Sequence, residues 1–365
     1  MPMHGNTEIF TPPIPKIHHE VSLPVRKRDV FIVSRWYDLA FFILSPLLAL
    51  ALGITASFTP LAQARAAMGG KAESFVTMVS GVVTMAHLVI VFFRSHANPG
   101  IFRLYPKRFI LAPLILFGAM MLSSWVLVFV FVLAVWWDVY HSSLQTFGLG
   151  RLYDKRAGND VRAARGLDQG LNLLLYAGPI FAGATLMAHA EHFHRFRDVG
   201  TALFARIPEV ALANQKYYAP LILGFGICYV AYYCLSYGRL YRKGYRIAWP
   251  KVALYAATGL CSIYTWGFNT FGQAFFIMNF FHALQYFALI WWAENKNLTA
   301  VLRLDRFGWG KGAALLLFLG AGIGYGLWAH FLGESSHAAF SLLLTVSILH
   351  FWYDGFIWSV RKGQV

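Results

Sequence analysis

Four histidines of the chain lie inside long apolar segments, and each belongs to a short row of polar side chains. The members of a row are three, four or seven residues apart, which places them on one face of a helix. The rows are His87 with Arg94, His141 with Asp138 and Gln145, His282 with Gln285 and Tyr286, and His350 with Asp354. Ionisable side chains are costly inside a bilayer, so such rows indicate a functional site.

The residue types in these rows are typical of metal ligands. Imidazole and carboxylate together suit iron, manganese or zinc. Asp138 with His141, and His350 with Asp354, resemble the acidic and histidine pairs of di-metal helical bundles. Alternatively, the two aspartates orient the imidazoles from behind. The three cysteines form no CxxC pair, so neither a thiolate site nor a disulfide framework is indicated.

Apolar helices must position these rows. The 365 residues are 58% hydrophobic and only 13% charged, against ~25% charged residues in a typical soluble domain. Ten apolar segments approach the ~20 residues that cross a bilayer as a helix. They are 37–58, 74–94, 108–124, 125–148, 167–189, 217–237, 250–268, 271–293, 312–332 and 338–360. The sequence therefore predicts an all-α, polytopic membrane bundle of about ten transmembrane helices, with a tight turn at Ser123 and Ser124.

The positive charges predict the orientation of this bundle. With the N-terminus in the cytoplasm, 25 of the 31 lysines and arginines fall in cytoplasmic segments, as the positive-inside rule requires. Both termini are then cytoplasmic, and we predict a multi-pass protein of the cell inner membrane. Residues 1–29 are predicted to be a flexible polar tail, and residues 30–365 a single transmembrane domain. The net charge of +15 is explained by topology and contact with the lipid bilayer, so nucleic acid is not an expected partner.

Topology also predicts that the four histidines share one depth. Their helices all run from outside to inside, and each histidine precedes the first cytoplasmic basic residue by 7 to 14 positions. At ~1.5 Å per residue, the four rings fall within about 10 Å of one another along the membrane normal. We therefore expect them to converge in the cytoplasmic half of the membrane.

The predicted metal site combines seven residues with four polar neighbours. The expected ligands are His87, His141, His282, His350, Asp138, Asp354 and, capping the site from the cytoplasmic side, His96. The residues expected to contact substrate, water or reacting groups are Arg94, Gln145, Gln285 and Tyr286. The competing interpretation is structural. Histidines can join helices by hydrogen bonds, and Asp138 or Asp354 can pair with Arg151 or Arg361 near the interface.

This set of residues predicts a metal-dependent oxidase or oxygenase that acts on a lipid-soluble substrate, with a possible electron donor. Iron, as one or two ions, is the expected cofactor, because a metal buried among apolar helices suits oxygen chemistry on such molecules. The first alternative is a b-type haem protein for electron transfer, in which pairs of histidines hold haem. The second is a proton- or ion-coupled transporter, in which the polar rows relay the ion.

Histidines placed on several helices around iron resemble the design of membrane carotenoid oxygenases, and the apolar setting resembles membrane desaturases. The HxxxH and HxxHH boxes of desaturases and hydroxylases are absent, since no two histidines stand four residues apart in the chain. The role of each residue is therefore taken from its own chemistry and position.

Overall fold

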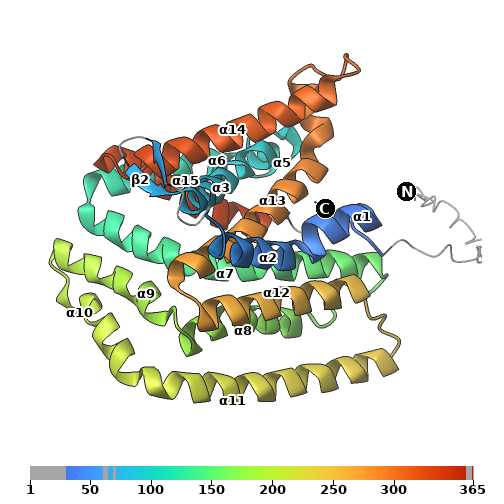
Figure 1. Cartoon of the computed structure of the whole chain (residues 1–365). Coiled ribbons are helices and arrows are strands. Elements are labelled where there is room, and N and C mark those ends of the chain that lie inside the picture. Colours follow the sequence, from blue (N-terminus) through green and yellow to red (C-terminus); the bar gives the residue numbers. More distant parts are fainter. Residues whose placement is uncertain (1–29, 61–64, 69–70, 359–363, 365) are drawn as a thin grey trace, which may run out of the picture.

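The computed structural model describes residues 30–60, 65–68, 71–358 and 364, and these are mainly helical (Figure 1). The first half contains α1 (Arg35–Asp38), the π-helix η1 (Leu39–Ile43), α2 (Ser45–Ser57), β1 (Arg65–Met68), β2 (Lys71–Ser74), α3 (Phe75–Val89), α4 (Val91–Ser95), α5 (Pro99–Leu104), α6 (Pro106–Leu122) and α7 (Ser124–Arg156). The second half contains α8 (Arg165–Ala182), α9 (Leu186–Ala190), the 3-10 helix η3 (Glu191–Val199), α10 (Ala202–Ala205), α11 (Ile207–Arg242), α12 (Trp249–Phe268), α13 (Phe271–Val301), α14 (Gly310–Leu332) and α15 (His337–Ile357). The predicted helical architecture is confirmed, with a short antiparallel β1–β2 hairpin added. The predicted tail 1–29 lies outside the described residues.

Six to eight stretches of the described chain are long and apolar enough to cross a membrane. Six are continuous helices or closely joined helices: Phe75–Ser95, Ser124–Arg156, Ala202–Arg242, Phe271–Val301, Gly310–Leu332 and His337–Ile357. Two more are bent pairs, Arg35–Ile43 with Ser45–Ser57 and Arg165–Ala182 with Leu186–Val199. These stretches indicate a membrane protein. The count of ten, the cytoplasmic termini and the inner membrane remain predictions.

The predicted segments 108–124 and 250–268 are helical but fall outside these candidate spans. The first is α6, which has 17 residues and ends at Leu122. The second is α12, whose first turn contains a proline and Lys251. The predicted break between the third and fourth segments is confirmed, because the Ser123 hydroxyl caps α7 by accepting a hydrogen bond from the Val126 amide.

The predicted helix 167–189 is wrong as a straight element, because α8 ends at Ala182 and the chain turns by 97°. Gly183 is extended at this point, and a Cβ atom there would lie 2.5 Å from the Cα atom of Gly267. The Ala184 amide donates a hydrogen bond to the Gly267 carbonyl at 3.0 Å. This close approach between two backbones requires glycine at the point where the chain turns away from the axis of α8.

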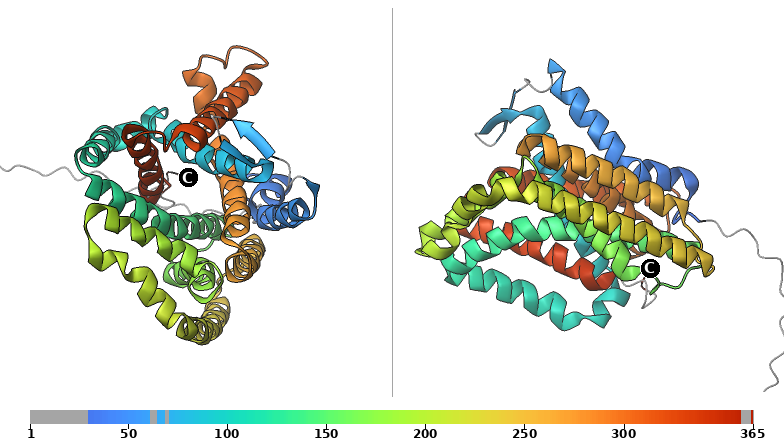
Figure 2. Two further views of the ribbon diagram at one scale, coloured as in Figure 1. Left: turned by 60° about the vertical axis from the view of Figure 1, so that its left-hand side comes forward. Right: turned by 90° about the horizontal axis from the view of Figure 1, so that it is seen from below.

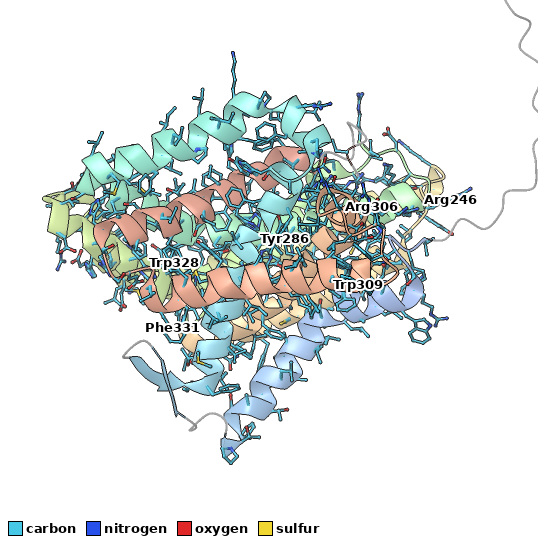
Figure 3. All side chains as sticks on the ribbon, turned by 90° about the horizontal axis from the view of Figure 1, so that it is seen from above. Arg246, Tyr286, Arg306, Trp309, Trp328 and Phe331 are labelled. Atoms are coloured by element: carbon cyan, nitrogen blue, oxygen red, sulfur yellow. The ribbon has the colours of Figure 1, made fainter. Side chains whose placement is uncertain are left out.

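The four helices that carry the histidine rows, α3, α7, α13 and α15, pack together near the middle of the bundle, whereas α11 lies at its edge (Figure 2). On the outer side of α3, α14 approaches closely because Gly326 leaves room, since a Cβ atom there would lie 2.3 Å from the Val82 carbonyl oxygen. Tyr286 of α13 is buried inside the bundle. In the view of Figure 3 its label stands between those of Trp328 and Arg306. The four helices α3, α7, α13 and α15 thus turn the histidines of their polar rows toward the interior of the bundle.

Candidate metal centre

Four histidine side chains from four helices meet inside the bundle. The residues are His87 of α3, His141 of α7, His282 of α13 and His350 of α15, and none is more than 3% exposed. Successive ring centroids are separated by 5.0 Å (His87–His282), 5.1 Å (His282–His141), 4.6 Å (His141–His350) and 5.0 Å (His350–His87). We call these four residues the histidine cluster. Their rings converge, as their common depth predicts.

Most ring nitrogens of the histidine cluster have no hydrogen-bond partner among the described residues. Both nitrogens of His87, both of His282 and Nδ1 of His350 are buried and unpartnered. Nε2 of His350 lies 3.0 Å from Nε2 of His141. A buried polar atom without a partner costs about 1–3 kcal/mol. Five such atoms in one cluster indicate a missing bonding partner, and a metal ion would bond one nitrogen of each ring.

The spacing of neighbouring rings suits ligands of a metal ion. His87, His282 and His350 have ligand atoms within 4.8 Å of one another, and His141 joins His350 in a second such group. The centroids of neighbouring rings are about 4.9 Å apart, the mean of the four separations. With a metal–nitrogen bond of ~2.1 Å, an ion lies about 3.3 Å from the centroid of each bound ring. The 3.0 Å separation of the two Nε2 atoms also matches two ligands about 90° apart on an ion. The donor set therefore fits a metal.

Asp354 adds a carboxylate to one side of the histidine cluster. Its Oδ2 atom lies 3.9 Å from Nε2 of both His141 and His350. Its Oδ1 atom accepts hydrogen bonds from the Tyr286 hydroxyl at 2.7 Å and the Trp358 indole at 2.9 Å. The ligand atoms of His141, His350 and Asp354 lie within 4.8 Å of one another, as do those of His87, His282 and His350. His350 belongs to both groups and links them.

Asp138 does not join either group of ligand atoms, contrary to the prediction. It lies on α7, three residues before His141, which displaces it by about one helical turn, roughly 4.5 Å, along the helix axis. The structural alternative for Asp138 is also wrong, because Arg151 pairs with Asp154 and Asp168 instead. For Asp354 the alternative partner Arg361 lies outside the described residues.

His96 also lies outside both groups, contrary to its predicted role as a ligand. Its Nδ1 atom contacts the Ser95 hydroxyl at 2.8 Å, and its Nε2 atom contacts the Phe109 carbonyl oxygen at 3.2 Å. Burial lowers the pKa of the His96 imidazole, which favours the neutral ring. Because both nitrogens are engaged and the ring packs against Phe102 and Tyr353, His96 joins helices and leaves no nitrogen for a metal.

Arg94 is held in a buried ion pair, which does not fit a group that meets substrate. Its Nη1 atom donates to Oε1 of Glu294 at 2.6 Å, and both residues are at most 4% exposed. The guanidinium also donates to the Ile357 carbonyl and stacks on the Trp358 ring, 3.8 Å from its centroid. Sequence reasoning missed Glu294, because it stands near the end of α13, where acidic residues are normally solvated.

Gln145 and Gln285 lie beside the histidine cluster and contact each other. The Gln145 amide donates to Oε1 of Gln285 at 3.0 Å and to the His282 carbonyl at 3.1 Å. The Gln285 amide donates to the Phe42 carbonyl at 2.9 Å. Oε1 of Gln145 is buried and has no partner among the described residues. This oxygen is free to accept a hydrogen bond, so the predicted contact of Gln145 with water or substrate stays a prediction.

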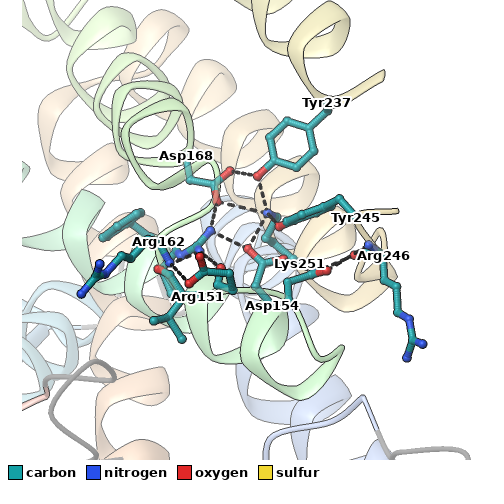
Figure 4. A network of polar contacts seen from close by, with 12 residues as sticks. Arg151, Asp154, Arg162, Asp168, Tyr237, Tyr245, Arg246 and Lys251 are labelled. Atoms are coloured by element: carbon teal, nitrogen blue, oxygen red, sulfur yellow. Dashed lines mark hydrogen bonds and ion pairs between the residues drawn. The ribbon is translucent and has the colours of Figure 1, made fainter. Parts of the chain in front are cut away.

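A second buried polar cluster was also missed from the sequence (Figure 4). Arg151 donates to Oδ2 of Asp154 at 2.6 Å and of Asp168 at 2.7 Å. Lys251 donates to the same two oxygens at 2.8 Å and 3.1 Å. We call these four residues the charge network. The one signal in the sequence is that all four stand at the ends of apolar segments, a position also typical of interface residues.

The arrangement as a whole can bind a cation with nitrogen and oxygen ligands in an apolar, water-poor interior. Two imidazoles and a carboxylate lie on one side of the site, and two further imidazoles complete the ring on the other. No family model, curated protein or solved structure matches this chain.

Proposed function

We propose that the chain is a metal-dependent oxidase or oxygenase whose metal, iron, is held by the histidine cluster and Asp354 and whose substrate is lipid-soluble. The observation that carries the proposal is the meeting of four buried imidazoles whose nitrogens are largely unpartnered. Unpartnered buried nitrogens are a stability cost that a bound metal removes. Iron, when bound, supplies the binding and activation of dioxygen.

The polar neighbours of the site have separate roles in this proposal. Tyr286 holds Oδ1 of Asp354, so that Oδ2 is left to face the metal. Gln285 holds the Gln145 amide group, whose oxygen then points to a water or a polar group of the substrate. Arg94 is removed from this list, because Glu294 neutralises it. The chain's own contribution is thus to orient ligands and to exclude water.

The surroundings of the site favour an apolar substrate over a charged one. Phe351 packs on the His141 ring with a centroid separation of 4.9 Å. Leu349, Phe281 and Met278 are buried hydrophobic residues on the same two helices, α15 and α13. Within the described chain, the buried cations Arg94, Arg151 and Lys251 are each paired with a carboxylate. A lipid-like molecule entering between helices would therefore meet mainly hydrophobic contacts.

The geometry disfavours the two alternatives. Haem held by two opposite histidines needs a flat space for the macrocycle between them, whereas the other two rings of the histidine cluster lie there, 4.6 to 5.1 Å from their neighbours. Ion transport needs a relay of groups that release the ion readily, whereas two buried groups of three ligands that share His350 favour retention. A metal centre that carries out oxygen chemistry therefore remains the hypothesis with most support.

Oxygen incorporation tests the proposed activity directly. Membranes from cells that express the full chain are supplied with iron and 18O2, and their lipid extract is compared with that from cells expressing His141→Ala/His350→Ala. We expect 18O-labelled products, or substrate oxidation coupled to reduction of dioxygen, only with the wild-type chain. Equal products from both chains would contradict the proposal. The number of labelled atoms per product distinguishes an oxygenase from an oxidase, and so indicates whether an electron donor is needed.

A further inference from the structure

The carboxylate of Asp354 is held by a chain of contacts that leads away from the histidine cluster. Trp358 and Tyr286 both donate to its Oδ1 atom. The Trp358 ring is covered by the Arg94 guanidinium, 3.8 Å from the ring centroid. Arg94 in turn is fixed by Glu294 at 2.6 Å. The contacts run from α13 through α4 to the end of α15, and they return to α13 at Tyr286.

We propose that Arg94 and Glu294 are positioning residues, which hold Trp358 so that it and Tyr286 turn the Oδ2 atom of Asp354 toward the metal. This inference rests on the proposed metal centre and deepens it. It gives a function to the buried ion pair between Arg94, which the sequence predicts near the substrate, and Glu294, which the sequence does not single out. It also assigns Trp358 and Tyr286 to ligand orientation instead of contact with the reacting atoms.

The contacts explain why Oδ2 of Asp354, and not Oδ1, faces the cluster. A carboxylate can rotate about its Cβ–Cγ bond, and two donors on one oxygen select a single orientation. Outer hydrogen bonds of this kind fix the ligand and adjust its basicity, and removing one typically weakens metal binding by 10–100-fold. Both donors to Asp354 lie on the side away from His141, since they share Oδ1 while Oδ2 faces the imidazoles.

Glu294 and Arg94 are suited to holding Trp358 rigidly. Asn98 and Asn297 donate to Oε2 of Glu294 at 2.8 Å and 3.3 Å, so both oxygens of the carboxylate are engaged. The guanidinium carries two further bonds to the Ile357 carbonyl, the residue next to Trp358. A planar guanidinium can stack on an aromatic face and fork its hydrogen bonds at the same time, which lysine cannot do.

Metal affinity of variants that each lack one donor or alter the Arg94 head group tests the inference. The full chain is purified in detergent without metal, and its affinity for Co²⁺ is measured by competition with a chelator, together with the Co²⁺ absorption spectrum. Trp358→Phe removes the indole donor and Tyr286→Phe removes the hydroxyl donor. We expect each to weaken Co²⁺ binding by about 10–100-fold and to change the spectrum, with Arg94→Lys falling between the wild type and Trp358→Phe.

Two matched controls lie on α15, the helix that carries Asp354. Tyr353→Phe removes a buried hydroxyl that has no partner among the described residues, and Trp352→Phe changes an indole that packs on Tyr353 and Phe356. Both should bind Co²⁺ as the wild type does. If either donor variant fails to fold, the other tests the same oxygen independently.

The outcomes separate this inference from the proposed function. Tight Co²⁺ binding by the wild type, with affinity and spectrum unchanged in Trp358→Phe and Tyr286→Phe, would overturn the positioning role and leave the metal centre standing. Failure of the wild-type chain to bind Co²⁺ or iron would overturn both.

Discussion

The histidine cluster and the charge network are both buried polar clusters, yet their polar atoms are satisfied to very different degrees. In the charge network, two carboxylates face two cations, and Tyr237 and Tyr233 donate to the remaining Asp168 oxygen at 2.6 Å and 2.9 Å. In the histidine cluster, five ring nitrogens have no partner among the described residues.

This difference separates a structural cluster from a ligand site. A buried charge is tolerated when it is paired and hydrogen-bonded, which is the case for Asp154, Asp168, Arg151 and Lys251. The charge network therefore needs no ligand to explain its presence. It joins α7, α8 and α12, whereas the unpartnered nitrogens of the histidine cluster support the proposed metal. We therefore predict that the charge network controls stability and that the histidine cluster controls metal content.

The largest expected effect is on the charge network. Lys251→Met leaves two buried carboxylates facing one guanidinium, and breaking a buried pair in this way typically costs 3–5 kcal/mol, so we expect a loss of about that size in the free energy of unfolding. Thermal unfolding in detergent measures it, with Lys243→Met, at an exposed position, as the control. The metal content of the folded fraction should stay unchanged. Metal loss without a loss of stability would reverse the roles of the two clusters.

Removal of metal should cause the next largest loss of stability, and only in the chain that has the wild-type site. A ligand present at 100 times its Kd stabilises the folded state by about 2.7 kcal/mol. Unfolding is followed with and without saturating Co²⁺, for the wild type and for His141→Ala/His350→Ala. Co²⁺ should stabilise the first chain and leave the second unaffected. Equal stabilisation of both would mean that the metal binds elsewhere.

A smaller effect is expected when a histidine is removed from the metal-free protein. His87→Leu eliminates two buried nitrogens that have no partner among the described residues, so metal-free stability should change by less than about 1 kcal/mol or increase. The same variant should bind metal more weakly. Thermal unfolding of both metal-free proteins measures the first effect. A loss of several kcal/mol would show that His87 is a structural residue like those of the charge network.

The smallest effect is expected at Asp138. Asp138→Asn keeps the size of the side chain, and the residue lies outside both ligand groups. Metal content and affinity should therefore match the wild type, while Asp354→Asn should lower both. Elemental analysis of the two variants, purified side by side, makes the comparison. Loss of metal in Asp138→Asn would restore this residue to the site.

The histidine cluster could be predicted from the sequence because it depends on two regular features. Helical periodicity places each histidine on the polar face of its own helix, and the predicted alternating topology places the four rings at one depth. The first feature acts within a single helix and the second follows from the order of helices along the chain, so neither needs knowledge of how the helices pack. Their meeting, with centroid separations near 5 Å, follows once the four polar faces turn away from lipid.

The remaining polar contacts could not be predicted, because they depend on packing between segments far apart in the chain. Glu294 and Arg94 are 200 residues apart, and Lys251 meets Asp154 across 97 residues. Their positions at helix ends are equally typical of solvated charges. Periodicity also ranked Asp138 and Asp354 alike, since each lies three or four residues from a histidine, and only the donors around Asp354 distinguish them.

Metal stoichiometry of the purified chain tests the central claim most directly. The wild type and His141→Ala/His350→Ala are purified in detergent from cells supplied with iron and analysed for iron, manganese, copper, zinc and protein in the same samples. We predict about one equivalent of metal, mainly iron, in the wild type, and almost none in the double variant. A wild-type chain with far less than one equivalent, or a double variant that retains the wild-type amount, would contradict it.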